Sequence, residues 1–118
     1  MDFEAIFKAL GEGTRIKILK LLSCKPMYVC ELEAILQISQ PRISQHLKIL
    51  RSENIVDMKK DGQKVIYSLS KKNIDLLFSE FNRFLEMPIN RLSGFKEESE
   101  RILLIADDPK INTCKSCK

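Results

Sequence analysis

The chain has 118 residues, of which 44% are hydrophobic and 31% charged, and its formal net charge is +4. This length supports one domain of ordinary size and excludes two domains with separate cores. No apolar run approaches the ~18 residues that a membrane span needs, and the N-terminus lacks a signal-peptide pattern. We therefore expect a cytoplasmic protein with no membrane association.

The N-terminal part of the chain predicts two helices. Apolar residues recur at helical spacing over residues 3–10, and a Gly-Glu-Gly sequence then interrupts the pattern. Thr14 is the predicted N-cap of a second helix over residues 14–23, because threonine hydroxyls accept hydrogen bonds from the free amides at the start of a helix. Pro26 follows this helix and ends it.

A helix-turn-helix is predicted next. A short amphipathic helix is expected from about Tyr28 to Leu36, with a tight connection over residues 37–39. Ser39 is the expected N-cap of the following helix, since Pro41 is tolerated only in a first turn. The residues that this second helix turns inward are Ile43, Leu47 and Leu50.

The stretch after the helix-turn-helix predicts a β-hairpin and further helices. Alternating apolar residues flank Asp61-Gly62, and this dipeptide between two such runs is a strong hairpin signal. A long amphipathic helix is predicted over about 71–87, ended or kinked by Pro88. One more helix is expected from Leu92 to Ala106, before a polar tail that ends in a CxxC sequence.

Basic residues are concentrated in the helix-turn-helix and the hairpin. Residues 40–72 contain eight Lys and Arg against three Asp and Glu, a local charge of +5, whereas the rest of the chain sums to −1. The order helix, helix-turn-helix, hairpin is the winged-helix plan. We therefore expect a mainly α fold of about six helices with a two-stranded wing, and the coincident basic excess favours binding to double-stranded DNA.

The predicted DNA contacts form a base-facing and a phosphate-facing set. In the major groove arginine pairs with guanine and glutamine with adenine, whereas lysines mainly contact phosphates. The base-facing set is Ser39, Gln40, Arg42, Ser44, Gln45 and His46, and the phosphate-facing set is Lys48, Arg51, Lys59, Lys60 and Lys64. His46 has two alternatives: a half-buried packing histidine or, less favoured because no second histidine accompanies it, a metal ligand. A winged helix that contacts only proteins is the alternative for the whole set.

Three sequence strings resemble the ArsR/SmtB family of metal-sensing repressors. They are FKALGEGTRIKILKLL, VCELEAILQISQPRISQHLKILRSENIV and KKDGQKVIYSLS, the most specific part being Ser39 to Leu47. The resemblance implies a homodimer formed by the first and last long helices, an inverted-repeat operator, and release from DNA when an inducer binds. The apolar surface of the long helix after the hairpin independently favours dimerisation. Residues 1–106 are thus expected to form the DNA-binding and dimerisation domain, and residues 107–118 the tail.

The four cysteines are candidate inducer ligands. Arsenic, cadmium and lead sensors of the family that this chain resembles carry Cys-Val-Cys-Asp-Leu where residues 28–32 read Tyr-Val-Cys-Glu-Leu, so only Cys30 carries over. Cys114 and Cys117 form the CxxC, whose spacing lets two sulfurs bind one soft ion. Together with Cys30 they supply three thiolates, which favours As(III) or Sb(III). Adding Cys24, a possible ligand only, gives four, which suits Cd(II), Pb(II) or Zn(II).

Other functions stay open from the sequence. The CxxC is alternatively an inert tail end, a redox or reactive-sulfur sensor, or half of a structural four-thiolate zinc site in a constitutive repressor. The resemblance also implies a test for zinc or nickel sensors, which in this family carry a histidine site on the long helix after the wing. Such a sensor is disfavoured, because residues 73–87 contain no histidine. An enzyme and an organic cofactor are not expected, because the chain has one histidine, no phosphate-binding glycine loop and no nucleophile elbow.

Overall fold

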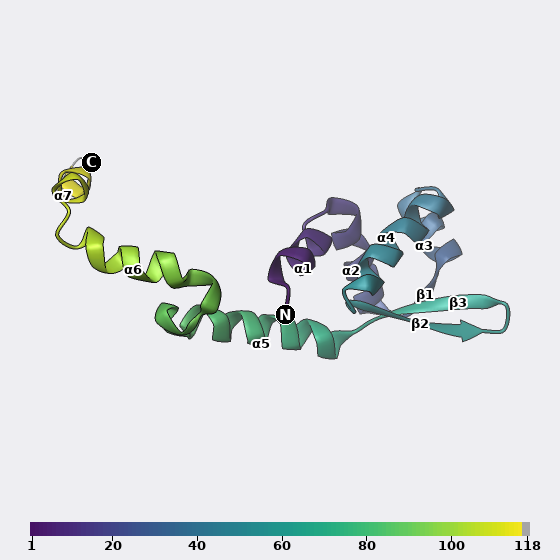
Figure 1. Ribbon diagram of the computed structural model, residues 1–118. Helices are drawn as coiled ribbons and strands as arrows, with labels where there is room; N and C mark the ends of the chain where they lie inside the picture. Colours follow the sequence, from purple (N-terminus) through teal and green to yellow (C-terminus); the bar gives the residue numbers. More distant parts are fainter. Residues whose placement is uncertain (117–118) are drawn as a thin grey trace. The chain divides into compact units, whose positions relative to one another are not determined.

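The computed structural model describes residues 1–116, and the packing divides the protein into two compact units. The first unit is Met1–Phe81 and the second begins at Asn82. The described residues form seven α-helices, where about six were expected, and one three-stranded sheet (Figure 1). None of the helices in residues 1–116 is long and apolar enough to cross a membrane.

The first unit begins with two helices, α1 (Phe3–Leu10) and α2 (Gly13–Cys24). The carboxylate of Asp2 caps α1 by accepting a hydrogen bond from the Ala5 amide at 3.1 Å. The prediction that Thr14 caps α2 is wrong. Glu12 is the N-cap, and its carboxylate accepts from the Arg15 amide at 2.9 Å, so the helix starts one residue earlier than predicted.

The predicted helix-turn-helix is confirmed as α3 (Val29–Leu36) and α4 (Gln40–Ser52). Gln37 ends α3 in the left-handed conformation, with φ 55° and ψ 44°, which turns the chain sharply towards α4. Ser39 occupies the N-cap position of α4 without a side-chain hydrogen bond, and a proline stands in the first turn of α4 as expected.

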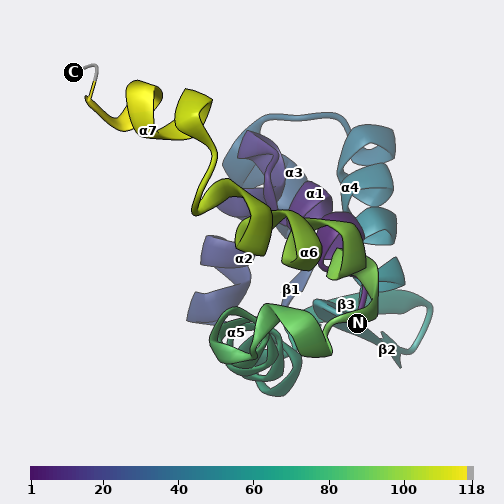
Figure 2. The same cartoon turned by 60° about the vertical axis from the view of Figure 1, so that its left-hand side comes forward.

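The wing is part of a three-stranded antiparallel sheet. Its strands are β1 (Met27–Tyr28), β2 (Val56–Asp61) and β3 (Lys64–Leu69), in the order β1-β3-β2. Gly62 adopts φ +66° in the two-residue turn between β2 and β3. Strand β1 was not predicted, because two residues are too few to show alternation. In Figures 1 and 2, α3 and α4 lie on the same side of the long β2–β3 hairpin.

The core of the first unit lies between the helices and the base of the hairpin. The inward stripe predicted for α4 is confirmed, since its three residues are fully buried. The largest fully buried side chains are Ile18, Leu32, Ile43, Leu47, Leu50, Ile55, Val56 and Leu77. Helix α5 (Lys71–Glu86) starts directly after β3, and the Phe81 ring packs edge-on against Phe3 and Phe7, with centroids 5.2 and 4.9 Å apart.

The second unit contains short helices. The single helix predicted from Leu92 to Ala106 is instead a 3-10 turn, η2 (Ser93–Phe95), followed by α6 (Lys96–Ile105), with another 3-10 turn, η1 (Ile89–Arg91), before them. Glycine and serine are poor helix formers, which explains the late start of α6 after Ser93-Gly94. Part of the predicted polar tail forms α7 (Pro109–Ser116).

Candidate nucleic-acid interface

One face of α4 is exposed and polar, opposite its buried stripe. Six of the predicted contact residues that belong to α4 or its N-cap are exposed, and Ser44 is half-buried. The exposed six are Ser39, Gln40, Arg42, Gln45, Lys48 and Arg51. The helical period thus separates donors for base edges and phosphates from the apolar residues that hold the helix on the core.

The predicted wing lysines lie at the exposed end of the hairpin. Strand β2 is buried at Val56 and exposed over the rest of its length, where Lys59 and Lys60 stand. Lys64 begins β3 and is also exposed. The hairpin therefore carries its cations away from the core, where a phosphate backbone can reach them.

A groove of about 400 Å³ joins the start of α4 to the wing tip. Gln40 and Ser44 of α4 line it from one side, and Gln63 and Lys64 of the wing line it from the other. Cys30, in the first turn of α3, is also on its wall. The fold therefore gathers three predicted contact residues, two from the helix and one from the hairpin, around one open surface.

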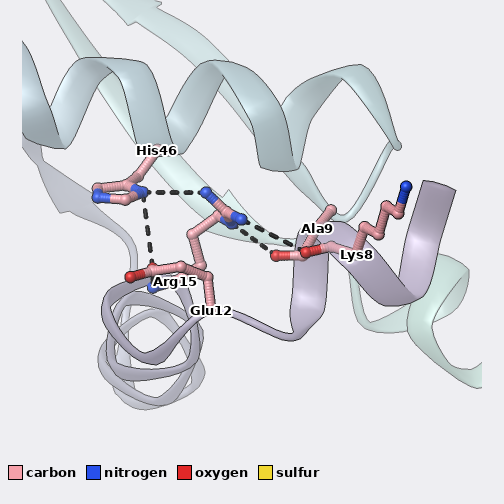
Figure 3. Close-up of polar contacts among 5 residues, drawn as sticks. All are labelled: Lys8, Ala9, Glu12, Arg15 and His46. Atoms are coloured by element: carbon pink, nitrogen blue, oxygen red, sulfur yellow. Dashed lines mark hydrogen bonds and ion pairs between the residues drawn. The ribbon is translucent and has the colours of Figure 1, made fainter.

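His46 does not share the orientation of its neighbours. Only 16% of its side chain is exposed, and Nδ1 lies 3.3 Å from Arg15 Nη1 and 3.8 Å from Glu12 Oε2 (Figure 3). This geometry matches the half-buried histidine considered from the sequence. A contact between His46 and DNA bases stays a prediction that this side-chain position does not favour.

Arg15 is a structural residue beside the candidate interface that the sequence reasoning missed. Its Nε donates to the Ala9 carbonyl at 2.7 Å while Nη1 faces His46, so one guanidinium ties α1 to α4 (Figure 3). Hydrogen bonding from the Arg15 amide lowers the pKa of the Glu12 carboxyl from its usual value, and the nearby charges of His46 and Arg15 act in the same direction. The available signal was the position of Arg15, because a cation in the first turn of a helix opposes the helix dipole.

The thiols predicted as ligands are accessible but are not gathered at one site. Cys24, Cys30 and Cys114 are free and exposed, and Cys117 lies outside the described residues. Within residues 1–116, no three His, Cys, Asp or Glu side chains are placed so as to hold a metal ion. Cys30 lines a second groove, of about 450 Å³, with Gln37 and Ser39 of the turn, so its sulfur is open to soft ions. The metal site stays a prediction.

Comparisons with known proteins agree with this architecture. Residues 12–58 match the family described as "Bacterial regulatory protein, arsR family". The chain is 36% identical over 81 residues to an arsenical resistance operon repressor of Staphylococcus aureus, an alignment that covers 69% of this chain and 78% of the repressor. It is also 36% identical over 78 residues to a cadmium resistance transcriptional regulatory protein CadC homolog of Staphylococcus aureus, covering 65% of this chain and 64% of that protein. Among solved structures, reduced HlyU from Vibrio cholerae matches with a TM-score of 0.56 and 32% identity, over 71% of this chain and 87% of HlyU.

Proposed function

Because this chain belongs to the arsR family of bacterial regulatory proteins, which are DNA-binding transcriptional regulators, we propose that it is a cytoplasmic, homodimeric repressor. It binds an inverted-repeat operator and leaves it when a thiophilic ion, As(III) or Sb(III), binds cysteine thiolates. The observation that carries the DNA-binding part is the groove in which Gln40 and Ser44 of α4 face Lys64 of the wing.

The arrangement of the exposed side chains supports base contacts from α4 and phosphate contacts from the wing. The N-terminal half of α4 carries forked and amide donors, including Arg42 and Gln45, which suit base edges in a major groove. Lys59, Lys60 and Lys64 suit phosphates beside that groove. A dimer presents two such surfaces, so the operator should contain two half-sites about one helical turn apart.

The DNA-binding part is tested by fluorescence anisotropy on a duplex that the protein itself selects from a random DNA pool. We expect binding that weakens steeply with salt. In Lys60→Ala the slope of log K against log salt should become less steep by about 0.9 for each phosphate that the variant no longer neutralises. Arg42→Ala should reduce discrimination between the selected and a scrambled duplex. Salt-independent or undetectable binding to every duplex would contradict the proposal.

The inducer part rests on the chemistry and exposure of the thiols. Cys30 lies in the first turn of α3, directly beside the helix-turn-helix groove, and Cys114 is exposed on α7. Thiolates repel one another, so gathering Cys30, Cys114 and Cys117 requires a cation. The relatives named for arsenical and cadmium resistance support a thiophilic inducer of this kind.

Release from DNA follows if the bound ion displaces the start of α3. That helix supports α4, and two half-sites tolerate little change in the spacing of two recognition helices. Coupling free energies of about 1 to 3 kcal/mol are usual for allostery, which corresponds to a roughly 5- to 150-fold weakening of operator affinity.

The inducer is tested by titrating the protein–DNA complex with arsenite. Cys30→Ser, Cys114→Ser and Cys117→Ser should each bind DNA like the wild type and resist release. Cys24→Ser is the matched control and should still be released, since three thiolates suffice for As(III). Undiminished release in the first three variants would exclude the arsenic site.

A second candidate is a thiol-redox repressor on the same scaffold. The exposed free thiols of Cys30 and Cys114 favour it, together with the likeness to a regulator solved in a reduced form. Two thiols would be oxidised to a disulfide, with two electrons and two protons passing to the oxidant. Release by diamide that dithiothreitol reverses, combined with indifference to arsenite, would favour this candidate over the metal-responsive one.

A further inference from the structure

Tyr28 connects the start of α3 to the tip of the wing. It is the last residue of β1 and the N-cap of α3, and it pairs with Ile66 of β3. Its hydroxyl donates a hydrogen bond to the carboxylate of Asp61, the last residue of β2. The Nζ of Lys64, the first residue of β3, lies 5.7 Å from the centroid of the Tyr28 ring.

The register of the sheet explains how one side chain reaches both strands of the wing. The strand order is β1-β3-β2, and Asp61 and Lys64 are partners across the β2–β3 ladder. The Tyr28 side chain therefore runs from β1 over β3 to the edge of β2. It contacts the last paired residues before the turn at Gly62.

We propose that Tyr28 is a positioning residue for DNA binding, whose hydrogen bond to Asp61 and contact with Lys64 hold the wing tip beside the start of α4. This inference rests on the proposed function and adds a specific residue to it. Tyr28, Lys64 and Gln40 line the same groove, so a fixed wing tip also fixes the width of the candidate DNA-binding surface.

The outer part of the wing needs such a support. Beyond Val56, the residues of β2 are exposed, and at the tip the paired Asp61 and Lys64 are both exposed. A two-stranded ribbon with so little apolar cover is marginally stable in water. Tyr28 is half-buried and belongs to β1, which joins the body of the first unit through the buried Met27. Tyr28 thus connects the wing tip to a strand that is anchored in the core, which restricts the movement of the tip.

The charges at the tip give the hydrogen bond a second effect. Asp61 lies on the wing among Lys59, Lys60 and Lys64, and an unbound carboxylate there repels DNA phosphates. The Tyr28 hydroxyl binds this carboxylate, while the Tyr28 ring attracts the Lys64 ammonium. Both contacts fix the position of the Asp61 carboxylate and of the Lys64 ammonium at the tip of the wing.

The experiment compares the full-length wild type with Tyr28→Phe, which removes only the hydroxyl. Tyr67→Phe is the matched control, because it removes the same hydroxyl from a half-buried tyrosine that lines the same groove and whose ring packs against the core. On the self-selected duplex we expect Tyr28→Phe to weaken binding by roughly two- to tenfold, and Tyr67→Phe to change it less. The magnitude of the slope of log K against log salt should decrease by about 1 for each lysine that no longer reaches a phosphate. Reduced stability alone does not produce this change.

A double-mutant cycle with Asp61→Ala separates positioning from simple charge. If Tyr28 acts through Asp61, Tyr28→Phe weakens binding in the wild-type background and has no further effect in the Asp61→Ala background. Equal effects in both backgrounds, or wild-type affinity and salt slope in Tyr28→Phe, would overturn the inference while leaving the proposed function intact. Failure of the wild type to bind any duplex would instead overturn the proposed function, and this inference with it.

Discussion

Arg15 shows how one side chain stabilises the contact between three helices. Its Nε and Nη2 donate to the carbonyls of Ala9 and Lys8, at 2.7 and 3.4 Å, and its Nη1 faces His46 of α4. Those carbonyls belong to the last turn of α1, where no amide of the helix remains to bind them. Arg15 therefore caps α1 from the side and at the same time supports the helix that carries the candidate base contacts.

Removing this guanidinium should destabilise the first unit. We expect Arg15→Ala to lower the free energy of unfolding by about 1 to 3 kcal/mol, because the Ala9 carbonyl, whose bond to Arg15 is half-buried, loses its donor. Arg15→Lys should recover only part of this, since an ammonium cannot reproduce the planar fork. Urea denaturation followed by circular dichroism measures the effect. Lys17→Ala, an exposed change on the same helix, is the control and should stay within about 0.5 kcal/mol of wild type.

The Tyr28 hydroxyl offers a direct test of its hydrogen bond without DNA. Hydrogen bonding to Asp61, together with desolvation and the Asp61 charge, raises the pKa of Tyr28 above its ordinary value of 10.0. The protonated phenol is the donor, so the bond is present below that ordinary pKa and is lost as the pH rises through the raised one.

In the Tyr67→Phe protein Tyr28 is the only tyrosine left, so tyrosinate absorbance reports its titration alone. We expect a midpoint above the ordinary tyrosine value, and adding Asp61→Asn should lower that midpoint because the neighbouring negative charge is removed. Circular dichroism over the same pH range is the control for unfolding. Identical midpoints with and without Asp61→Asn would show that the two side chains do not interact.

At the residue scale, the buried and exposed positions of α4 were largely predictable. The contacts between side chains far apart in the sequence were not. Ile43, Leu47 and Leu50 follow the helical period and are buried as predicted. His46 is three residues after Ile43 and four before Leu50, so it lies at the edge of the same stripe, which explains why it turns inward. Arg15 and His46 are 31 positions apart, and nothing local in either stretch specifies their contact.

At the element scale, long periodic segments were predictable and short ones were not. The helix predicted over 71–87 is α5 (Lys71–Glu86), and the Asp-Gly hairpin is confirmed. Strand β1 exists because β3 pairs with it, a tertiary effect that two residues cannot encode by themselves. Helix α2 starts earlier than predicted because the Glu12 carboxylate accepts a hydrogen bond from the Arg15 amide of the same helix. Glutamate is a less common N-cap than threonine.

The turn of the wing gives a prediction for a whole element. Gly62 holds φ +66°, a conformation that costs other residues about 1 to 2 kcal/mol, so Gly62→Ala should destabilise the hairpin by about that amount. Operator affinity should fall together with stability, because the wing lysines lose their common orientation. Gly13→Ala is the matched control, since a Cβ at Gly13 meets nothing within 4 Å and α2 already has helical backbone there.

Measurement of the unfolding free energy and of the Kd for DNA in both variants decides the question. Gly13→Ala should leave the Kd unchanged and hold or raise stability by up to about 1 kcal/mol. Equal affinity in the wild type and Gly62→Ala would show that DNA binding does not depend on the shape of the hairpin.

At the scale of the whole molecule, the sequence predicted the elements that build the proposed DNA-binding surface, but it could not predict whether the thiols of the proposed inducer site come together. The surface is built from α4 and the wing, two segments close in sequence whose geometry the fold class largely dictates. The proposed ion site needs Cys30 from the first unit, Cys114 from the second and Cys117 beyond the described residues. Spacing along the chain places the thiols of a CxxC together, but it does not determine whether they meet a third thiol far away in the sequence.

The exposed apolar side chains of α5 make dimerisation of the whole molecule testable. Leu76 and Phe78 of α5 are 48% and 50% exposed, and they flank Leu77, which is fully buried in the core of the first unit. Exposed large apolar side chains on one helix favour a protein partner, and a second copy supplies the two-fold symmetry that an inverted-repeat operator requires. Burying a glutamate at such a contact is costly, so Phe78→Glu should shift the protein towards the monomer.

Sedimentation equilibrium measures this shift, and Ile16→Glu is the control because it makes the same kind of change, an exposed apolar side chain to glutamate, on α2 instead of α5. We expect the wild type and Ile16→Glu to be dimers at micromolar concentration and Phe78→Glu to dissociate. Operator affinity should then fall in Phe78→Glu alone, while weak, salt-dependent binding to a scrambled duplex persists, since each subunit keeps its own α4 and wing. A Phe78→Glu protein that stays dimeric, or a wild type that is already monomeric, would contradict the assignment of the exposed side of α5 to the dimer.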